Sequence, residues 1–224
     1  MLNIENKSKY YFNFKKDNLT RKRILQVNNL SLYFFNKPLL KGISFEVFEK
    51  EKIAIYGDSG SGKTLLILCM AGFLEHKGEI IFYEKADIKL KIGVSAIENI
   101  KPIFEDFDIF EILEYYAKSL KLSFSNDKIK NFLKLFEISN KSIKDLSAVE
   151  KAFISFLIAY ISDPEVLLLD EITKELSEDN MIFFWKKIEP LIKEKTLIFT
   201  TKRKQELMIA NRVLFIEKGE LNII

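Results

Sequence analysis

The chain has 224 residues, of which 48% are hydrophobic and 30% charged, and its formal net charge is +3. This is enough material for one domain with a full core and an attached subdomain. A single cysteine, Cys69, excludes an internal disulfide and a multi-cysteine metal site, and a single histidine excludes a multi-histidine site. Because this histidine, His76, lies in the polar turn Glu75-His76-Lys77-Gly78, we also expect no Ser-His-Asp triad. No apolar run is long enough to cross a bilayer, and the chain does not start like a signal peptide, so we expect any membrane contact to be made through a partner.

The positive charge is concentrated at the start of the chain. Residues 1–24 hold seven Lys or Arg and two acidic residues, a charge of +5, which leaves −2 for the remainder. We therefore expect a basic N-terminal extension over residues 1–24 and one folded domain over residues 25–224. A solvated arm is favoured over an arm that lies on an anionic membrane. The slightly acidic remainder offers nucleic acid little to bind, so we expect no nucleic-acid partner.

The first half of the folded part alternates in the manner of strands. Residues 25–34 and 43–47 predict two antiparallel strands, with a turn at Asn36-Lys37-Pro38. Residues 53–56 form a short apolar strand, residues 64–74 a helix, residues 78–83 another strand, and residues 92–94 one more.

The second half is mainly helical before it returns to strands. From residue 102 to about 141 the apolar period is helical, which indicates a helical insert. Ser147 opens a long helix that reaches residue 161 and is broken at Asp163-Pro164. A buried strand follows at 166–169, then a helix at 181–192 closed near Pro190, a strand at 196–200, and a pair of strands at 212–216 and 220–223 around Gly219. The fold class is α/β.

The organising motif lies between the strand at 53–56 and the helix after it. Its residues are Gly57, Asp58, Ser59, Gly60, Ser61, Gly62, Lys63 and Thr64. The glycines allow successive backbone N–H groups to face phosphate oxygens, and the start of the helix adds its positive end. Lys63 would reach the β- and γ-phosphates, and the Thr64 hydroxyl would hold Mg²⁺. A glycine turn without a ligand is the alternative, and the flanking strand and helix disfavour it.

Two carboxylates stand at the C-terminal end of the strand at 166–169, where open α/β sheets bind ligands. We expect Asp170 to hold Mg²⁺ through its coordination shell and Glu171 to polarise the water that attacks the γ-phosphate. The alternative is a solvated strand end. Together with the phosphate loop, the pair predicts one Mg-nucleotide site.

The order of these elements, together with Met70-Ala71-Gly72-Phe73-Leu74 and Gly78-Glu79-Ile80, resembles the nucleotide-binding subunit of ABC transporters. The resemblance covers about residues 25–224, and residues 146–171 match the family's signature-helix-to-Walker-B block without a gap. Residues 106–117 are similar to the segment after the family's glutamine loop in drug- and polysaccharide-type exporters. The resemblance implies a P-loop NTPase fold of the ABC type: a mixed central sheet, an antiparallel β subdomain and a helical subdomain at about residues 100–160.

The family implies an ATPase that works as a head-to-tail dimer with ATP and Mg²⁺. Each ATP is clamped between one subunit's phosphate loop and the other's signature helix, here starting at Ser147. The expected partners are a transmembrane permease and a second cassette, identical or different, at the cytoplasmic face of the membrane. Phe34 takes the place of the aromatic residue that stacks on adenine, with a core role as the open alternative. Phe104, Phe107, Ile109 and Phe110 are candidates for permease docking, although a subdomain core is favoured for them.

Several positions depart from the family pattern. The signature Leu-Ser-Gly-Gly-Gln is replaced by Leu146-Ser147-Ala148-Val149-Glu150. The new side chains add bulk and a negative charge where a γ-phosphate would approach. Ser147 and Glu150 also fit a capping box, which would occupy the N–H groups that a phosphate needs. Lys202 replaces the switch histidine, and a lysine ammonium can donate but not accept a hydrogen bond.

Other family positions differ as well. No glutamine occupies the glutamine loop, where Asn99 or Glu98 could still reach Mg²⁺ or the water. The proline after the catalytic glutamate is Ile172, and the aspartate of the dimer-contact loop is Ser177. We therefore expect tight Mg-ATP binding with slow turnover, in an asymmetric complex. The leading function is the ATP-hydrolysing subunit of a membrane transporter; the alternative is a nucleotide-gated interaction subunit with little hydrolysis.

Overall fold

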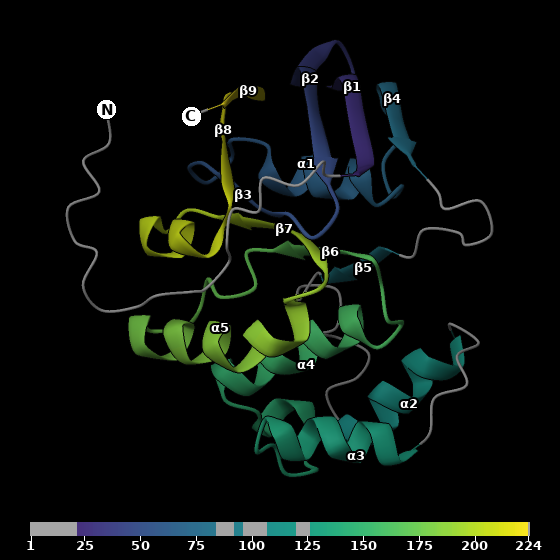
Figure 1. The fold of residues 1–224 in the computed structure, drawn as a ribbon, viewed down its shortest axis with the longest axis vertical. Helices are drawn as coiled ribbons and strands as arrows, with labels where there is room; N and C mark the ends of the chain where they lie inside the picture. The colour runs from purple at the N-terminus through teal and green to yellow at the C-terminus, as the bar shows by residue number, and fades with distance from the viewer. Residues whose placement is uncertain (1–21, 84–91, 96–106, 120–125, 224) are drawn as a thin grey trace.

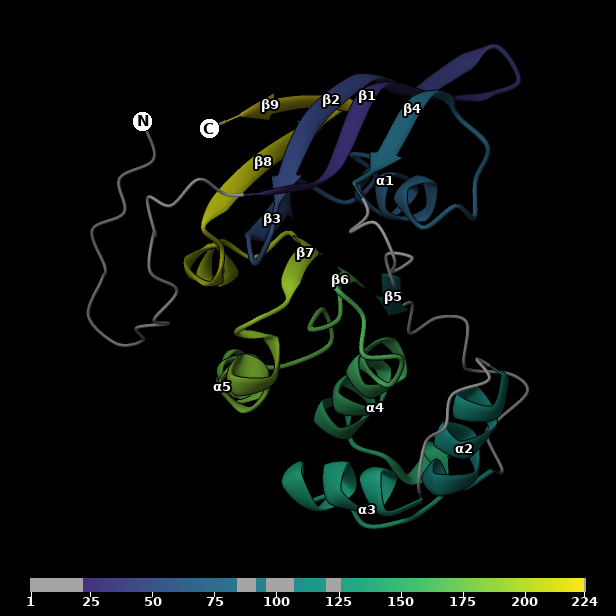
Figure 2. The ribbon, with the colours of Figure 1, turned by 45° about the vertical axis from the view of Figure 1, so that its right-hand side comes forward.

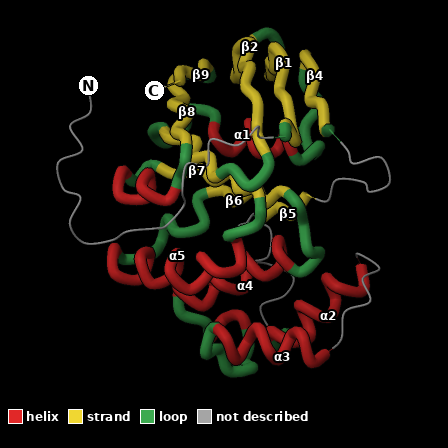
Figure 3. Tube along the Cα trace, viewed as in Figure 1, coloured by secondary structure: helices red, strands yellow, loops and turns green. Residues whose placement is uncertain are grey.

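The computed structural model describes residues 22–83, 92–95, 107–119 and 126–223. Two sheets and two helical layers are stacked along the long axis of the molecule (Figures 1 and 2). A three-stranded sheet lies at one end, a six-stranded sheet in the middle and the helices α2–α5 at the other end, with α1 between the two sheets (Figure 3). Within the described part of the chain, no helix has the length and apolar character needed to cross a membrane.

The three-stranded sheet is antiparallel and has β1 (Arg23–Phe34) at its centre, between β2 (Lys37–Phe48) and β4 (Lys77–Phe82). The predicted turn at residues 36–38 is wrong by about two residues, because β2 already begins at Lys37 and Pro38 pairs with Tyr33. The turn is made by Phe35, whose φ of +51° is left-handed, and by Asn36. Pro38 is tolerated because β2 is an edge strand of this sheet, where a missing N–H need not break a ladder.

The six-stranded sheet has the order β5-β6-β7-β3-β8-β9. Its strands are β5 (Ile92–Ser95), β6 (Val166–Asp170), β7 (Thr196–Thr201), β3 (Lys52–Tyr56), β8 (Arg212–Glu217) and β9 (Glu220–Ile223), and only the β8–β9 pair is antiparallel. Alternate residues of β6 enter different cores: Leu168 packs toward α1, while Leu167 and Leu169 pack toward the helical layers. This two-sided burial explains why the strand reads as a continuous apolar run.

The helices cover the two faces of this sheet. Helix α1 (Lys63–Met70) lies on one face, and α4 (Ala148–Tyr160) and α5 (Glu178–Ile192) lie on the other (Figure 2). Helices α2 (Ile109–Ser119) and α3 (Asn126–Leu135) form the outermost layer, and two short 3₁₀ helices span Ile143–Asp145 and Lys204–Ile209. Helices α2, α3 and α4 and the 3₁₀ helix Ile143–Asp145 lie between β5 and β6 in the chain, in the stretch for which we predict a helical subdomain.

Two helix ends differ from their predictions. Helix α1 stops at Met70 rather than residue 74, because the chain turns at Gly72, where φ is +78°. Helix α5 begins three residues before the predicted start, since Ser177 caps it by accepting from the Asn180 N–H, and it continues through Pro190 to Ile192. Pro190 does not close it because Ile188 and Ile192 on either side are fully buried and hold the last turn against the core.

Candidate functional site

Three neighbouring parallel strands end at the same edge of the six-stranded sheet. Tyr56 at the end of β3 pairs with Thr201 of β7, and Asp170 at the end of β6 pairs with Thr200 of β7. Whatever follows these three strands must therefore meet at that edge. The phosphate loop follows β3, Glu171 follows Asp170 and Lys202 follows Thr201, which brings the predicted catalytic parts together.

The phosphate loop has the shape expected of an anion cradle. A side chain at Gly57 would place its Cβ 2.2 Å from the Ile216 carbonyl oxygen, so only glycine fits there. Gly60 has φ +79° with open space at its Cβ position, and Gly62 caps α1 with φ +111°. Asp58, Ser59 and Gly60 are exposed at the tip. The cradle is therefore open to a ligand on one side and closed by protein on the other.

The rest of the fold holds this loop in place. The Gly57 N–H donates to the Thr201 carbonyl at 3.3 Å, and the Gly219 N–H in the β8–β9 turn donates to the Ser61 carbonyl at 3.0 Å. The buried Ser61 hydroxyl has no hydrogen-bond partner among the described residues. Since a buried polar atom without a partner is costly, this hydroxyl fits a loop that is completed by a polar ligand.

Lys63 is held where a phosphate chain would pass. Its side chain is only 3% exposed, and its Nζ donates to the carbonyls of Gly57 at 2.7 Å and Asp58 at 2.9 Å. The same Nζ lies 3.1 Å from Glu171 Oε1. The lysine predicted to bind the β- and γ-phosphates and the glutamate predicted to polarise the attacking water are thus direct neighbours.

Thr64 and Asp170 also meet. The Thr64 Oγ1 donates to Asp170 Oδ2 at 2.8 Å, which places a hydroxyl beside a carboxylate oxygen. Mg²⁺ prefers such oxygen ligands, and it is commonly bound through one or two protein groups together with substrate phosphates. Within the described residues no cluster of three or more His, Cys, Asp or Glu could hold a metal unaided. The residues present therefore fit a magnesium ion that arrives with a nucleotide.

Thr200 links the Asp170 carboxylate to the Glu171 backbone and was not among the predicted site residues. Its Oγ1 donates to Asp170 Oδ1 at 2.6 Å and accepts the Glu171 N–H at 2.9 Å. Glu171 itself has φ +41°, a left-handed conformation that costs a residue other than glycine about 1 kcal/mol or more. Such strain is typical of functional positions, and here it accompanies the turn of the chain toward Lys63. The small polar pair that ends β7 was the sequence signal for Thr200.

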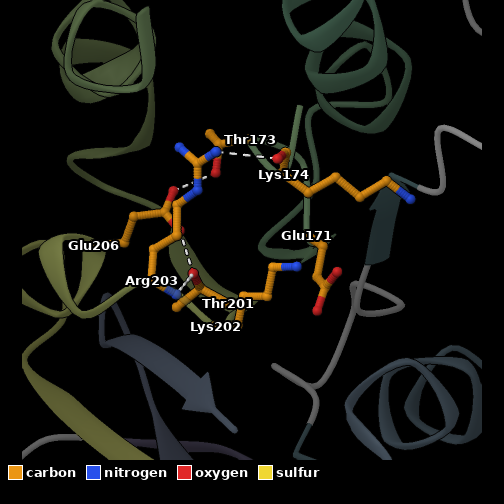
Figure 4. A pocket seen from close by; sticks show the side chains of 7 residues that line it. All are labelled: Glu171, Thr173, Lys174, Thr201, Lys202, Arg203 and Glu206. Carbon is orange, nitrogen blue, oxygen red and sulfur yellow. Dashed lines mark hydrogen bonds between the residues drawn. The ribbon is translucent and has the colours of Figure 1, made fainter. Parts of the chain in front are cut away.

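Lys202 lies across a hollow from Glu171 (Figure 4). The hollow measures about 170 Å³ including open solvent, and it is lined by Glu171, Thr173, Lys174, Thr201, Lys202, Arg203 and Glu206. In Figure 4 the Lys202 side chain extends toward the Glu171 carboxylate. The residue that replaces the switch histidine can therefore supply a positive charge beside the predicted catalytic glutamate.

Ser147 is engaged in a network of its own at the start of α4. Ser147 and Glu150 form the predicted capping box, in which Glu150 Oε2 accepts from the Ser147 N–H at 2.8 Å and from its hydroxyl at 2.7 Å. The Lys141 ammonium lies 3.0 Å from the same carboxylate. Partial burial acts to raise the pKa of Glu150, but the bonds from Ser147 and Lys141 outweigh it and hold this pKa below its ordinary value. Glu150 is thus an anion at neutral pH.

Phe34 lies at the end of β1, and its side chain is 63% exposed. Its ring meets the Phe35 ring edge-on at 4.8 Å between centroids. The core alternative for Phe34 is therefore wrong, and stacking on adenine stays a prediction. Among the docking candidates, Ile109 is fully buried in the core whereas Phe107 is 47% exposed.

Several predictions fall on parts of the chain that the structure does not describe. Asn99 and Glu98, proposed as reaching Mg²⁺ or the water, lie outside the described residues, as does Phe104. Residues 1–21 of the basic extension also lie outside them. Of the predicted metal ligands, the structure describes Thr64 and Asp170.

Comparisons with known proteins identify the family. The family model described as ABC transporter matches residues 40–174. An uncharacterised ABC transporter ATP-binding protein of Methanocaldococcus jannaschii is 29% identical over 203 residues, which cover 88% of this chain and 75% of that protein. The spermidine/putrescine import ATP-binding protein PotA of Spiroplasma citri is 26% identical over 88% of this chain and 60% of its own length.

Solved structures show the same fold. An ATP-binding cassette of an ABC transporter aligns with a TM-score of 0.77 at 20% identity, covering 89% of this chain and 90% of that one. CbiO1 of Clostridium perfringens, described as part of the transporter complex cbiONQ, aligns with a TM-score of 0.72 at 22% identity, covering 90% and 87%. The matched family model spans more than half of the sequence and includes the phosphate loop and both carboxylates, and so the chain belongs to the ABC transporter family, as one of its ATP-binding, ATP-hydrolysing subunits.

Proposed function

We propose that this chain binds Mg-ATP at the edge where β3, β6 and β7 end, and that it couples the binding and hydrolysis of ATP to a transmembrane permease. One observation carries the proposal: the phosphate loop and the carboxylates meet, through Thr64 and Asp170 at 2.8 Å and through Lys63 and Glu171 at 3.1 Å. Two motifs more than 100 residues apart in the sequence converge there because their strands lie in one sheet, separated only by β7.

Each residue has a role that its surroundings support. The loop from Gly57 to Thr64 binds the phosphates, and Lys63 contributes its charge from a nearly buried position. Thr64 and Asp170 hold the magnesium ion, which would neutralise phosphate charge when bound. Glu171 accepts a proton from the attacking water as general base, and Lys202 stabilises charge across the hollow. Phe34, with its exposed ring, offers a stacking surface for adenine.

The binding step can be tested with substitutions that separate its parts. In equilibrium dialysis, Lys63→Ala should weaken Mg-ATP binding by about tenfold or more, because a charge-assisted contact contributes about 1.5–3 kcal/mol. Lys187→Ala is the matched control, since Lys187 forms an ion pair with Glu137 on the helical side of the molecule. Glu171→Gln should retain binding and lose hydrolysis. A wild-type chain that takes up no nucleotide in the presence of magnesium would contradict the proposal.

Family membership also supports a proposal for the assembly. We propose a head-to-tail pair of cassettes, identical or different, at the inner face of the membrane, with a permease as the transmembrane partner. The relative described as part of the cbiONQ complex supports a multi-subunit transporter. The similarity of residues 106–117 to exporters gains no support from PotA, which is described as an import protein. Of the described docking candidates, Phe107 is exposed, whereas Phe110 is partly buried against the core.

A second candidate function has its own observation. The capping box and Lys141 place an anion at the start of α4, where the family's signature would receive the γ-phosphate of the opposite subunit. This favours a subunit whose own signature contributes little, within an asymmetric complex that binds nucleotide and hydrolyses it slowly. An ATPase rate of the chain alone that comes within severalfold of an ordinary transporter cassette would contradict this candidate. Glu171→Gln in the assembled transporter separates the two functions, because it abolishes transport only if this chain's hydrolysis drives it.

A further inference from the structure

A buried carboxylate lies beside the residues of the candidate site. Glu206 belongs to the 3₁₀ helix Lys204–Ile209, is 1% exposed and forms part of the wall of the hollow (Figure 4). It accepts hydrogen bonds from the hydroxyls of Thr173 and Thr201, and from Trp185 Nε1 at 2.7 Å. All three donors are neutral groups, so these contacts to the Glu206 carboxylate are hydrogen bonds and not ion pairs.

The three donors come from three different elements. Thr201 directly precedes Lys202, and Thr173 follows Glu171 by two residues. Trp185 lies in α5 and is itself 1% exposed. Glu206 therefore fastens the segment that carries Lys202 to the segment that carries Glu171, and ties both to a helix of the layer below.

Arg203 makes a second tie between the same two segments. Its Nη2 donates to the carbonyl of Lys174 at 3.0 Å and to that of Leu176 at 2.5 Å, and its N–H donates to the Thr201 hydroxyl at 2.9 Å. The loop after Glu171 is thus bound to the loop after β7 at several points. A displacement of one loop would have to carry the other with it.

A buried carboxylate at this position is unfavourable for the stability of the fold. Burial penalises its charge, and an apolar side chain of similar size would pack there without that cost. What a carboxylate adds is direction, because its two oxygens fix the hydroxyls of Thr173 and Thr201 and the indole N–H at once. That is the property needed where two catalytic side chains must keep a set separation.

We infer that Glu206 is a positioning residue for ATP hydrolysis, which holds Lys202 and Glu171 in register and links both to Trp185. The inference rests on the proposed function, since it needs these two residues at the γ-phosphate. Glu206 does not touch the nucleotide in this scheme, and it acts only through its neighbours. Its removal should therefore slow turnover without weakening the binding of Mg-ATP at the phosphate loop.

The chain provides its own reporter. Trp185 is the single tryptophan in the sequence, and its ring lies 5.0 Å from Phe199 of β7 and 5.4 Å from Phe184. Because its indole N–H is bonded to Glu206, a shift of the two loops on nucleotide binding changes the surroundings of the fluorophore. We expect Mg-ATP to alter the emission of the wild-type protein.

The experiment compares Glu206→Gln with Glu51→Gln in the full chain. Glu51 is a matched control: it is also buried, at 4% exposed, and accepts from the Phe48 N–H at 2.9 Å, but it pairs with Arg212 next to the opposite end of β3. Three quantities are measured: the Mg-ATP dissociation constant by equilibrium dialysis, single-turnover hydrolysis with protein in excess, and the tryptophan emission with and without Mg-ATP. Circular dichroism checks that each variant is folded.

In the Glu206 variant the dissociation constant should change less than about threefold while turnover falls about tenfold or more, the loss expected when reacting groups are misplaced. The nucleotide-dependent emission change should disappear. Glu51→Gln should alter none of the three. If wild-type turnover is too slow to compare, the emission change alone decides.

Several results would overturn the inference. These are a Glu206→Gln protein with near wild-type turnover and an intact emission change, and one in which binding and turnover fall by the same factor. If Glu206→Gln does not fold, Thr173→Val, which removes a single donor, must show the same pattern for the inference to stand. A wild-type chain without Mg-ATP uptake overturns the proposed function and the inference together, whereas normal wild-type binding with an unaffected variant overturns the inference alone.

Discussion

Replacing Glu150 by glutamine should destabilise the fold while improving the site that α4 offers to an opposite subunit. The substitution restores the family's amide at this position and removes the anion at the start of the helix. In the structure Glu150 accepts two hydrogen bonds from Ser147 and forms an ion pair with Lys141. The side chain of Glu150 is 19% exposed and that of Lys141 is 31% exposed. The stabilising and the inhibitory effects come from the same carboxylate, so they should change together.

The size of the stability loss can be assembled from these contacts. The partly exposed ion pair contributes about 0.5–1 kcal/mol, and a charged acceptor at a helix N-terminus a further 0.3–1 kcal/mol. Glutamine keeps an acceptor oxygen for Ser147, so the capping bonds weaken rather than vanish. We expect a loss of about 1–2 kcal/mol, which for a chain of this length lowers the melting temperature by about 2–8 °C.

Urea unfolding followed by circular dichroism measures this loss. Because the pKa of Glu150 lies below its ordinary 4.5, its contribution is present at neutral pH and is lost as the pH falls through the folded-state pKa. The gap between wild type and Glu150→Gln should therefore shrink on acidification. Glu137→Gln is the control, because Glu137 pairs with Lys187 from a 76% exposed position without capping a helix. A Glu150 variant as stable as this control, or one with lower ATPase activity than wild type, would refute the reasoning.

Three further predictions concern the core and the phosphate loop. Burial lowers the pKa of Lys52 to about 8, so the unfolded chain binds more protons than the folded chain between pH 8 and 10.5. In urea titrations, the free energy of unfolding of wild type should therefore rise by about 2 kcal/mol relative to Lys52→Met across that range. A relative fall in the stability of wild type would contradict this. Cys69 is buried and its pKa is raised to about 11, so a thiol reagent such as DTNB should label it only after denaturation, and rapid native labelling would exclude that. Gly57→Ala must displace the Ile216 carbonyl and should lose Mg-ATP binding. Gly60→Ala meets open space and only a positive φ, so it should cost about 1 kcal/mol of stability. Equal effects of the two substitutions on stability and on Mg-ATP binding would argue against this loop geometry.

The order of strands and helices could be predicted from the sequence because apolar period and turn chemistry were locally clear. The apolar run predicts the buried strand β6, and the glycines after β3 predict a loop that leads into α1; the structure confirms both elements. The errors fall where tertiary packing decides. Pro190 reads as a helix end, but buried Ile188 and Ile192 carry the helix past it.

The site was predicted in its parts but not in its connections. Lys63, Asp170 and Glu171 could be named because motif residues have fixed chemistry at fixed spacing. Glu206 could not be named, since nothing local distinguishes a glutamate that will be buried from the many that are exposed. Its role depends on Trp185 and on two threonines brought together only by the folded chain.

The phosphate loop around Lys63 and the start of α4, the two regions predicted to contact ATP, differ in how their polar groups are satisfied. The half around Lys63 has an exposed loop tip at Ser59 and Gly60, a strained Glu171, and a buried Ser61 hydroxyl without a partner among the described residues. The half at the start of α4 does the opposite, because Glu150 already satisfies the amide and hydroxyl of Ser147. If the start of α4 faces a phosphate of an opposite subunit, the Glu150 carboxylate should weaken that contact, whereas the loop around Lys63 is unaffected by it. We therefore expect this chain to work in the asymmetric complex proposed above, and a homodimer with two equally active ATP sites would contradict that expectation.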